Sequence, residues 1–501
     1  MNLASNLERH AAERPAHAAV LFEGGSLGYA ELDAAASRLA QGLRARGIAA
    51  GERVALYLPN IPEYLVAYYA AQKLGAITVA INSIFRSAEV QYLLADSGAR
   101  VVFTVAELVP FVPRAECPAL EQIVVCEGEA PAGCATLAEW SAGGNTSCPG
   151  VACAPEAPAA LLYSSGTTGF PKGVTLTQRN IASNIAAAAR YSGYRPDDRL
   201  AAFLPLFHVY GQNYIMNAAV HAGATLVLFR RFVPEPVLQA VARERITMFF
   251  GVPTIFIGLL AMDLSKYDLS SIRYEMSAAA TMPEEISRRW TERFGRRVYE
   301  GYGLTECSPF ACYNDLVEHR FGSVGRAIEG FELAIFDEAE RELPRGRWGE
   351  IVIRGPGVMQ GYWRRPEDSA QALRGGWLHS GDIGRMDDAG YVYIVDRVKD
   401  MINVAGFKVW PAEVEQYLYK LPGVQEVAVY GLPHPDKGEQ VVAAVVPRPG
   451  HALGAEDVLA YCRTHIAAYK VPARVDIVAE LPKSATGKIL KRVLREQAGR
   501  S

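Results

Sequence analysis

The sequence predicts an α/β protein: a large N-terminal part of β-sheets covered by helices, followed by a small α+β part at the C-terminus. Two observations predict the large part. At 501 residues the chain is too long for one simple core, and helix-like and strand-like runs alternate along it. A third observation predicts the small part, because the alternation gives way near residue 396 to a hairpin-like run and further strands.

Alternating elements fill the first half of the chain. The spacing of apolar residues predicts helix 31–47, strand 52–59, helix 62–76 and strand 77–81. Residues 106–157 are rich in Pro, Ala, Gly and Cys, which predicts a mostly surface connection. The alternation then resumes, with strand 159–165, helix 177–193, strand 224–229 and strand 246–252. This alternation favours parallel sheets covered by helices.

The uncharged stretch 202–229 could be mistaken for a membrane span, which needs about 20 predominantly apolar residues. Polar residues, glycines and a proline interrupt it: Pro205, His208, Gly211, Gln212, Asn213, Asn217 and Gly223. We therefore interpret the stretch as a buried helix and strand around a pocket, and we predict no transmembrane segment.

Composition excludes several functional classes. The formal net charge of −3, from 51 basic and 54 acidic residues, gives no basic excess that would indicate a nucleic acid partner. The eight cysteines form no C-x-x-C pair and fit no common zinc spacing, so we predict neither a metal-cysteine site nor structural disulfides. Residues 1–15 carry charges where a signal peptide needs an apolar run, which predicts a cytoplasmic protein.

The region after residue 396 has enough length for one small α+β domain. Residues 390–411 read as a hairpin-like run with charges at its centre. Two strands are predicted at 424–432 and 439–447, and a helix at about 455–466.

The segment "YSSGTTGFPKGV", residues 163–174, has the composition of a phosphate-binding loop. Glycines allow close backbone approach, hydroxyl groups donate hydrogen bonds, and Lys172 supplies a positive charge. The spacing differs from the usual G-x-x-x-x-G-K-[ST] loop, because Lys172 follows Pro171. The segment alone is therefore not enough to predict phosphate binding, and other motifs in the chain have to support it.

Three further segments carry groups that suit a nucleotide. "VYEGYGLTECSP" brings together Tyr302, which can stack on a base, and Glu306, which can hold Mg²⁺. In "LHSGD" Asp382 can accept from both hydroxyls of a ribose, and "TGK" places Lys488 after a turn. Each has a plainer alternative: a satisfied loop glutamate, a surface ion pair with Arg397, and a solvated lysine.

In order and wording these segments closely resemble the adenylate-forming superfamily of acyl-CoA synthetases, peptide-synthetase adenylation domains and beetle luciferases. The resemblance covers about residues 10–495 and rests on "SSGTTGFPKGV", "GYGLTE", "SGD", "DRVKDMI" and "TGK". It implies an enzyme that joins a carboxylic acid to AMP from MgATP and then passes the acyl group to a thiol. It also implies an ATP- and acid-binding domain at 1–396, a hinge at 397–400 and a mobile domain at 401–501.

The resemblance assigns the nucleotide-binding residues. The β- and γ-phosphates would be held by Ser164, Ser165, Gly166, Thr167, Thr168, Gly169 and Lys172. Thr305 would contact the α-phosphate, Glu306 the Mg²⁺, and Asp382 and Arg397 the ribose. The adenine would lie between Tyr302 and the segment Ser277, Ala278, Ala279 and Ala280, with Glu300, Gly301 and Gly303 also contributing to the nucleotide site.

Lys488 matches the family's catalytic lysine, which bridges the acid and the α-phosphate in the first half-reaction. The family's small domain rotates between half-reactions, about a hinge that here matches Lys399. Gly406 matches the glycine beside the tunnel for the pantetheine arm of CoA, with Lys408 close to it in sequence. His208 matches a residue at the mouth of the acid pocket.

Most of the residues expected to line the acid pocket are apolar or carry hydroxyls: His208, Tyr210, Gln212, Tyr214, Phe250, Val252, Ala278, Gly301, Ser308 and Pro309. No arginine among them could pair a second carboxylate and no aspartate could pair an ammonium group, which disfavours dicarboxylates and amino acids. Similarity to fatty-acid CoA ligases predicts a medium- or long-chain fatty acid. Aromatic or alicyclic acids remain the alternative, because Tyr210 and "ATMP" resemble coumarate and benzoate ligases.

Two positions depart from the commonest family pattern. Ala278 stands for a glycine, which could narrow the floor of the acid pocket, and Thr281 stands for a proline. Asn403 replaces a lysine that is common in the plant coumarate ligases.

The cofactors and substrates implied are ATP, Mg²⁺ and CoA. Only thirteen residues follow Lys488, too few for a fused carrier domain. Free CoA is therefore the expected acceptor, and a separate carrier protein is the alternative. A luciferase-like oxygenase and a nucleotide-binding protein without catalysis are less favoured. A homodimer is left open.

Overall fold

Four β-sheets organise the part of the chain that the computed structural model describes, residues 1–164, 170–314, 316, 318–397 and 400–499. One has eight strands in the order β19-β9-β8-β4-β3-β5-β6-β7. Its strands are β3 (Arg53–Leu56), β4 (Ile77–Ala80), β5 (Val101–Thr104), β6 (Gln122–Val125), β7 (Ala135–Thr136), β8 (Pro158–Ser164), β9 (Lys172–Thr177) and β19 (Gly361–Tyr362). Strands β3 to β8 are paired in parallel, and β8 and β9 form an antiparallel hairpin.

The second sheet has nine strands in the order β16-β15-β14-β13-β12-β10-β11-β1-β2. Its strands are β1 (Ala18–Phe22), β2 (Gly25–Gly28), β10 (Arg199–Ala202), β11 (Thr225–Leu228), β12 (Met248–Gly251), β13 (Tyr274–Ser277), β14 (Val298–Gly303), β15 (Phe310–Tyr313) and β16 (Arg326–Ala327). Because β12, β13 and β14 are parallel neighbours, their carboxyl ends at Gly251, Ser277 and Gly303 share one edge.

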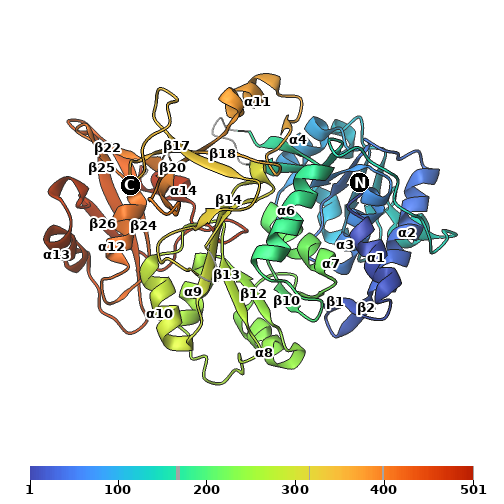
Figure 1. Cartoon of the computed structure of the whole chain (residues 1–501), viewed down its shortest axis with the longest axis horizontal. Coiled ribbons are helices and arrows are strands. Elements are labelled where there is room, and N and C mark those ends of the chain that lie inside the picture. Colours follow the sequence, from blue (N-terminus) through green and yellow to red (C-terminus); the bar gives the residue numbers. More distant parts are fainter. Residues whose placement is uncertain (165–169, 315, 317, 398–399, 500–501) are drawn as a thin grey trace.

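Helices cover both sheets, as Figure 1 shows. Their bounds are α1 (Ser5–Glu13), α2 (Tyr29–Ala45), α3 (Pro62–Lys73), α4 (Ser87–Ser97), α5 (Leu137–Ser141), α6 (Gln178–Tyr191), α8 (Pro234–Glu244), α9 (Pro253–Leu260) and α10 (Glu284–Phe294). Capping residues fix where α6 begins, directly after the β8–β9 hairpin. The Thr177 hydroxyl accepts from the Asn180 backbone N–H at 3.1 Å, and the Asn180 side chain accepts from the Thr177 N–H at 2.9 Å.

The expectation of a mostly surface connection over 106–157 was partly wrong. Strands β6 and β7 extend the eight-stranded sheet beyond β5, and α5 covers it. Val124 is fully buried and Trp140 nearly so. The short strands escaped prediction because Pro, Gly and Ala separate them, and the sheet edge rather than local propensity holds them in place.

The uncharged stretch 202–229 is buried, as expected. It forms the π-helix η3 (Tyr210–Asn217), the helix α7 (Ala218–Ala222) and the interior strand β11. All eight residues of η3 are buried. Within the described residues, no helix combines the length and apolar character needed to cross a membrane. A π-helix is rare and is frequently found at functional sites.

A four-stranded sheet follows, in the order β17-β18-β20-β21, with β17 (Glu332–Phe336), β18 (Gly349–Arg354), β20 (Leu378–Met386) and β21 (Val392–Arg397). The prediction that 390–411 forms one hairpin-like run was wrong in its pairing. Strand β21 pairs with β20, and a separate hairpin joins β22 (Ile402–Val404) to β23 (Phe407–Val409). The run is therefore divided between two sheets, with β21 ending at Arg397 and β22 beginning at Ile402.

The last sheet holds β22, β23, β24 (Val424–His434), β25 (Gly438–Pro447) and β26 (Arg474–Ile477). Helices α12 (Pro411–Leu418), α13 (Ala455–His465) and α14 (Lys491–Ala498) belong to the same region, which lies at one end of the molecule beside α9 and α10 (Figure 1). The predicted fold class, a large N-terminal part of helix-covered sheets and a small C-terminal α+β part, is therefore confirmed.

Candidate active site

The β8–β9 hairpin presents the ends of the predicted phosphate-binding segment. Ser164 at the end of β8 is paired in register with Lys172 at the start of β9. Five predicted phosphate ligands, Ser165, Gly166, Thr167, Thr168 and Gly169, lie outside the described residues. The segment after them is anchored, because the Tyr92 hydroxyl of α4 donates to the Pro171 carbonyl at 2.9 Å.

The Lys172 side chain is mostly buried and has a carboxylate partner. Its side chain is 11% exposed, and Nζ donates to Oδ1 of Asp368 at 2.5 Å. The ring of Tyr362 lies 5.1 Å from the same ammonium group. The hydrogen bond and the charge of Lys172 lower the pKa of Asp368 from its ordinary value.

Glu306, the predicted Mg²⁺ ligand, is buried beside the phosphate hairpin. It belongs to the short 3₁₀ turn η4 (Thr305–Cys307), which directly follows the end of β14 and also contains Thr305. Its Oε1 accepts from the Ser164 hydroxyl at 2.8 Å and from the Tyr362 hydroxyl at 3.1 Å. A predicted phosphate ligand and the predicted metal ligand are therefore in direct contact.

The predicted ribose ligands meet at the junction of two sheets. Oδ2 of Asp382, on β20, accepts from the Tyr302 hydroxyl at 2.7 Å, and Oδ1 accepts from Nε of Arg397 at 2.9 Å. Burial and the nearby Asp382 carboxylate raise the pKa of Tyr302 well above its usual value, so this hydroxyl stays protonated and donates.

The predicted adenine segment starts where β13 ends. Ser277 is paired with Glu300 across β13 and β14, and the Ala278 N–H donates to the Gly251 carbonyl at 3.3 Å. Beyond it, Ala279 adopts a positive φ of 68° and is exposed, as is Ala280. The segment thus lies at the carboxyl edge of the parallel strands, close to Gly301, Tyr302 and Gly303 on β14.

The Glu300 carboxyl group is buried, and few hydrogen bonds compensate for its loss of solvation. Oε1 has no hydrogen-bond partner among the described residues, although the Met282 backbone N–H donates to the carboxyl group. Desolvation, which the Met282 hydrogen bond only partly offsets, raises the pKa of Glu300 to about 8. A neutral carboxylic acid at this position can donate a hydrogen bond.

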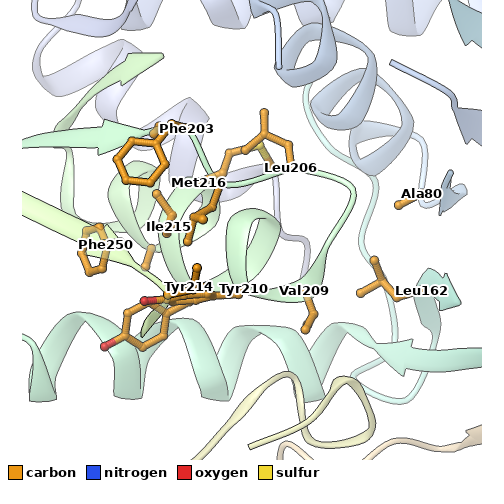
Figure 2. Close-up of a cluster of buried hydrophobic side chains, with 14 of the residues drawn as sticks. Ala80, Leu162, Phe203, Leu206, Val209, Tyr210, Tyr214, Ile215, Met216 and Phe250 are labelled. Atoms are coloured by element: carbon orange, nitrogen blue, oxygen red, sulfur yellow. The ribbon is translucent and has the colours of Figure 1, made fainter. Parts of the chain in front are cut away.

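The aromatic side chains predicted to line the acid pocket pack against one another in a buried cluster. The rings of Tyr210 and Tyr214 lie 5.4 Å apart on η3 (Figure 2), and the ring of Phe250 on β12 lies 5.8 Å from Tyr214. The Tyr214 hydroxyl contacts the Ser192 hydroxyl at 2.5 Å and Sδ of Met276 at 2.7 Å. The Tyr210 hydroxyl is buried and has no partner among the described residues.

Of the other predicted pocket residues, Gly301, Ser308 and Pro309 lie in closely packed surroundings, whereas Gln212 is bound to another helix. A side chain at Gly301 would approach Cε of Met276 to 2.5 Å, which leaves room at this position only for glycine unless Met276 moves. Ser308 is buried, with its hydroxyl donating to the Gly357 carbonyl at 2.8 Å, and Pro309 follows it. Gln212 is directed elsewhere, because its Oε1 accepts from the Tyr64 hydroxyl of α3 at 3.0 Å.

The loop with the predicted catalytic lysine docks on the large N-terminal part. The Thr254 hydroxyl of α9 donates to the Gly487 carbonyl at 3.0 Å, and a side chain at Gly487 would approach Val252 to 2.8 Å. Desolvation, and then the positive charge of Lys488, lower the pKa of His208 to about 4. Nδ1 of His208 accepts from the Tyr210 N–H at 3.2 Å, so His208, Lys488 and the acid pocket lie together.

The residues predicted to contact CoA do not lie beside His208 and Tyr210. Gly406 turns the β22–β23 hairpin with a φ of 88°, and Nζ of Lys408 pairs with Glu338 at 3.1 Å in an exposed position. The Lys408 ammonium group is therefore not directed at His208 or Tyr210. Lys399, the predicted hinge residue, lies outside the described residues.

The sequence analysis missed several residues that the fold brings to the site: Tyr194, Met276, Tyr362 and Asp368. Tyr194 stacks on Phe250 with ring centroids 5.9 Å apart. Asp368 lies in the polar first turn of α11 (Pro366–Ala372), where a carboxylate is ordinary, so no local signal distinguishes it.

Comparison with known proteins adds the following. Residues 7–363 match the model of the AMP-binding enzyme family, and residues 413–488 match the C-terminal domain of that family. A long-chain-fatty-acid–CoA ligase of Bacillus subtilis (strain 168) is 36% identical over 99% of this chain and 94% of the relative. A feruloyl-CoA synthase of an Amycolatopsis species is 38% identical over 98% of both chains. The crystal structure of the anthranilate CoA ligase AuaEII in complex with anthranoyl-AMP superimposes with a TM-score of 0.94 at 31% identity, covering 99% of this chain and 97% of that one.

Proposed function

The chain belongs to the AMP-binding enzyme family of AMP-forming acid–CoA ligases, and on this basis we propose that it activates a medium- or long-chain fatty acid. ATP and CoA are the family's other substrates. The acid carboxylate attacks the α-phosphate of ATP, which releases pyrophosphate and forms an acyl-adenylate. The thiol of CoA then attacks the acyl carbonyl, forms the thioester and releases AMP.

The observation that carries the proposal is the meeting of Lys488, His208 and the acid pocket. The Gly487 carbonyl is held by Thr254, and Lys488 acts electrostatically on His208. An ammonium group at this point can pair with both the attacking carboxylate and the α-phosphate, two anions that otherwise repel each other. His208, with a pKa of about 4, is neutral near pH 7 and adds no charge of its own.

The nucleotide would be held from both sides of the cleft. Asp382, fixed by Tyr302 and Arg397, presents acceptor oxygens for the ribose hydroxyls. Ser164 and Lys172 present a hydroxyl and an ammonium group for the β- and γ-phosphates. Adenine would lie over Tyr302, beside Ser277, Ala278, Ala279 and Ala280.

A magnesium ion fits one side of this arrangement. Glu306 offers a buried carboxylate beside Ser164, and oxygen ligands next to phosphates are the environment that Mg²⁺ prefers. When bound, the ion would neutralise phosphate charge. Among the described residues no group of three or more His, Cys, Asp or Glu side chains is placed to hold a metal, so phosphate oxygens would complete the coordination.

The acid pocket supports an apolar acyl group. Tyr210, Tyr214 and Phe250 are buried, and Tyr194 and Phe310 pack against them. No lysine, arginine or aspartate is among the residues assigned to this pocket.

A second candidate substrate is an aromatic acid with a polar ring substituent. The observation that favours it is the Tyr210 hydroxyl, which is buried without a partner among the described residues. A buried hydroxyl of this kind costs about 1–3 kcal/mol, and a hydroxyl or amino group on the substrate ring would satisfy it.

The second half-reaction requires a different arrangement of the C-terminal part. We propose rotation of residues 401–501 about 397–400, which would withdraw Lys488 and bring the hairpin with Gly406 and Lys408 to the pocket. CoA is the proposed acceptor, and a separate carrier protein is the alternative.

The test is release of AMP and pyrophosphate from ATP across acids from acetate to palmitate, plus benzoate, ferulate, cyclohexanecarboxylate and anthranilate, with and without CoA. We expect an optimum at one aliphatic chain length, and AMP release that depends on CoA. A preference for ring acids would favour the second candidate. AMP release that is equal without CoA would contradict the acceptor, and no turnover with any acid would contradict the proposed function.

A further inference from the structure

The ammonium group of Lys172 already has an anionic partner, which is none of the residues predicted to bind the nucleotide. Asp368 belongs to α11, far from β9 in sequence, and its carboxylate meets Lys172 at 2.5 Å. Antiparallel pairing of β19 with β9 places the chain before α11 alongside Lys172. The Trp363 N–H, which donates to the Gly173 carbonyl at 2.7 Å, extends this attachment toward α11.

The two partners differ in their access to water. The Lys172 side chain is 11% exposed and that of Asp368 is 33% exposed. A buried ammonium group without a counterion is costly, whereas a carboxylate that can turn into solvent loses little. If another anion approaches Lys172, Asp368 is therefore the group that leaves.

Asp368 also has a second cation within reach. Nη1 of Arg365, one turn earlier, lies 3.6 Å from Oδ2 of Asp368. Arg365 is positioned by its own hydrogen bond to the Tyr92 hydroxyl at 2.8 Å, and its buried Nε has no partner among the described residues. The carboxylate thus lies between the Lys172 ammonium group and a guanidinium group with an unused donor.

We propose that Asp368 is a positioning residue that holds Lys172 until the phosphates of ATP displace it, after which its carboxylate turns to Arg365 and solvent. The inference rests on the proposed function, because it requires Lys172 to bind nucleotide phosphate. The Lys172–Asp368 pair keeps the ammonium group in place between turnovers. Its cost is competition, since each ATP molecule must replace one carboxylate.

This competition predicts that removing the Asp368 charge strengthens MgATP binding, whereas mutations near a binding site usually weaken it. Asp368→Asn removes the competing charge but keeps the shape of the side chain, so MgATP should bind more tightly. Arg365→Gln removes the second partner of Asp368, strengthens the hold on Lys172, and should weaken MgATP binding. Glu367→Gln is the matched control, because this exposed carboxylate lies on the same turn of α11.

The experiment is isothermal titration of MgATP into the full-length wild-type protein and the three variants. We expect the Kd to fall about twofold to fivefold in Asp368→Asn, the range of a partly exposed ion pair, and to rise in Arg365→Gln. Glu367→Gln should match the wild type. In steady state the KM for ATP should change in the same directions, while kcat should not increase.

A background without the ammonium group separates this role from a structural one. In Lys172→Gln, addition of Asp368→Asn should leave the Kd unchanged, because nothing remains for Asp368 to hold. An equal or higher Kd in the single Asp368→Asn variant would overturn the inference, as would the same change in both backgrounds. If Asp368→Asn does not fold, unchanged or tighter binding by Arg365→Gln overturns it. Wild-type protein that fails to bind MgATP would overturn the proposed function as well.

Discussion

The hydroxyl of Tyr302 donates to Oδ2 of Asp382 at 2.7 Å and so joins β14 of the nine-stranded sheet to β20 of the four-stranded sheet. Arg397 holds the other carboxylate oxygen at 2.9 Å, from the neighbouring strand β21. Tyr302 and the paired strands β20 and β21, which are distant in sequence, thus form one buried acceptor at the edge of the predicted nucleotide site.

This triad predicts that Asp382→Ala weakens ATP binding. Loss of hydrogen bonds to a charged group is typically about 1.5–3 kcal/mol, so we expect the KM for ATP to rise about 10–100-fold. The protein should also be less stable, because Arg397 and Tyr302 lose their partner. Asp387→Asn is the control, since Asp387, directly after the end of β20, pairs with Arg320 at 2.7 Å and not with Tyr302. An unchanged KM in Asp382→Ala would contradict the ribose assignment.

A change at Lys488 should separate the two half-reactions. In the proposed mechanism Lys488→Gln removes the ammonium group that would pair with the reacting anions, so we expect adenylate formation to fall roughly 10²–10³-fold. Thioester formation from a supplied acyl-adenylate and CoA should stay near the wild-type rate, because the proposed rotation would withdraw the lysine in that step. Rapid-quench measurement of both steps checks this, with the exposed Lys420→Gln as control. Equal loss in both steps would argue against a role confined to adenylation.

Glu300 predicts that the protein loses stability as the pH rises. Its pKa is raised from an ordinary 4.5 to about 8, so between these values the folded protein holds a proton that the unfolded chain has released. The free energy of unfolding contributed by this group therefore falls as pH rises from about 4.5 to about 8.

The Glu300→Gln variant should not show this fall in the free energy of unfolding, because glutamine does not ionise. Its stability relative to the wild type should increase with pH, by at most about 1.4 kcal/mol per pH unit within the window. Urea unfolding at intervals from pH 5 to pH 9 checks the slope, with the exposed Glu292→Gln as the control that should show none. A difference that is constant with pH would mean that Glu300 is ionised in the folded protein.

Tyr210 offers a test of the acyl substrate. Tyr210→Phe removes a hydroxyl without a partner among the described residues, so stability should be unchanged or higher. Tyr214→Phe is the control and should be destabilised, because the Tyr214 hydroxyl contacts Ser192 and Met276. For a fatty acid substrate Tyr210→Phe should keep or raise kcat/KM. A fall in kcat/KM limited to acids with a ring hydroxyl or amino group would instead identify the aromatic substrate.

Local patterns predicted the long elements well. Helices α2, α3 and α6 were expected from apolar spacing, and β4, β11 and β12 from short apolar runs. The segment 106–157 was harder, because β6 and β7 depend on an existing sheet edge and carry little signal of their own. The pairing of β21 with β20 was also missed, since strand pairing is decided by contacts distant in sequence.

By itself, the sequence determined the fold class, the family and the chemical types available, because phosphate, ribose and carboxylate each need particular side chains in a recognisable order. Only the tertiary structure decided which of these side chains contact one another. It paired Lys172 with Asp368, Ser164 with Glu306, and the Lys488 loop with Thr254. These contacts join segments up to hundreds of residues apart, and their hydrogen bonds and charges act over a few ångströms, a distance that spacing along the chain does not reveal.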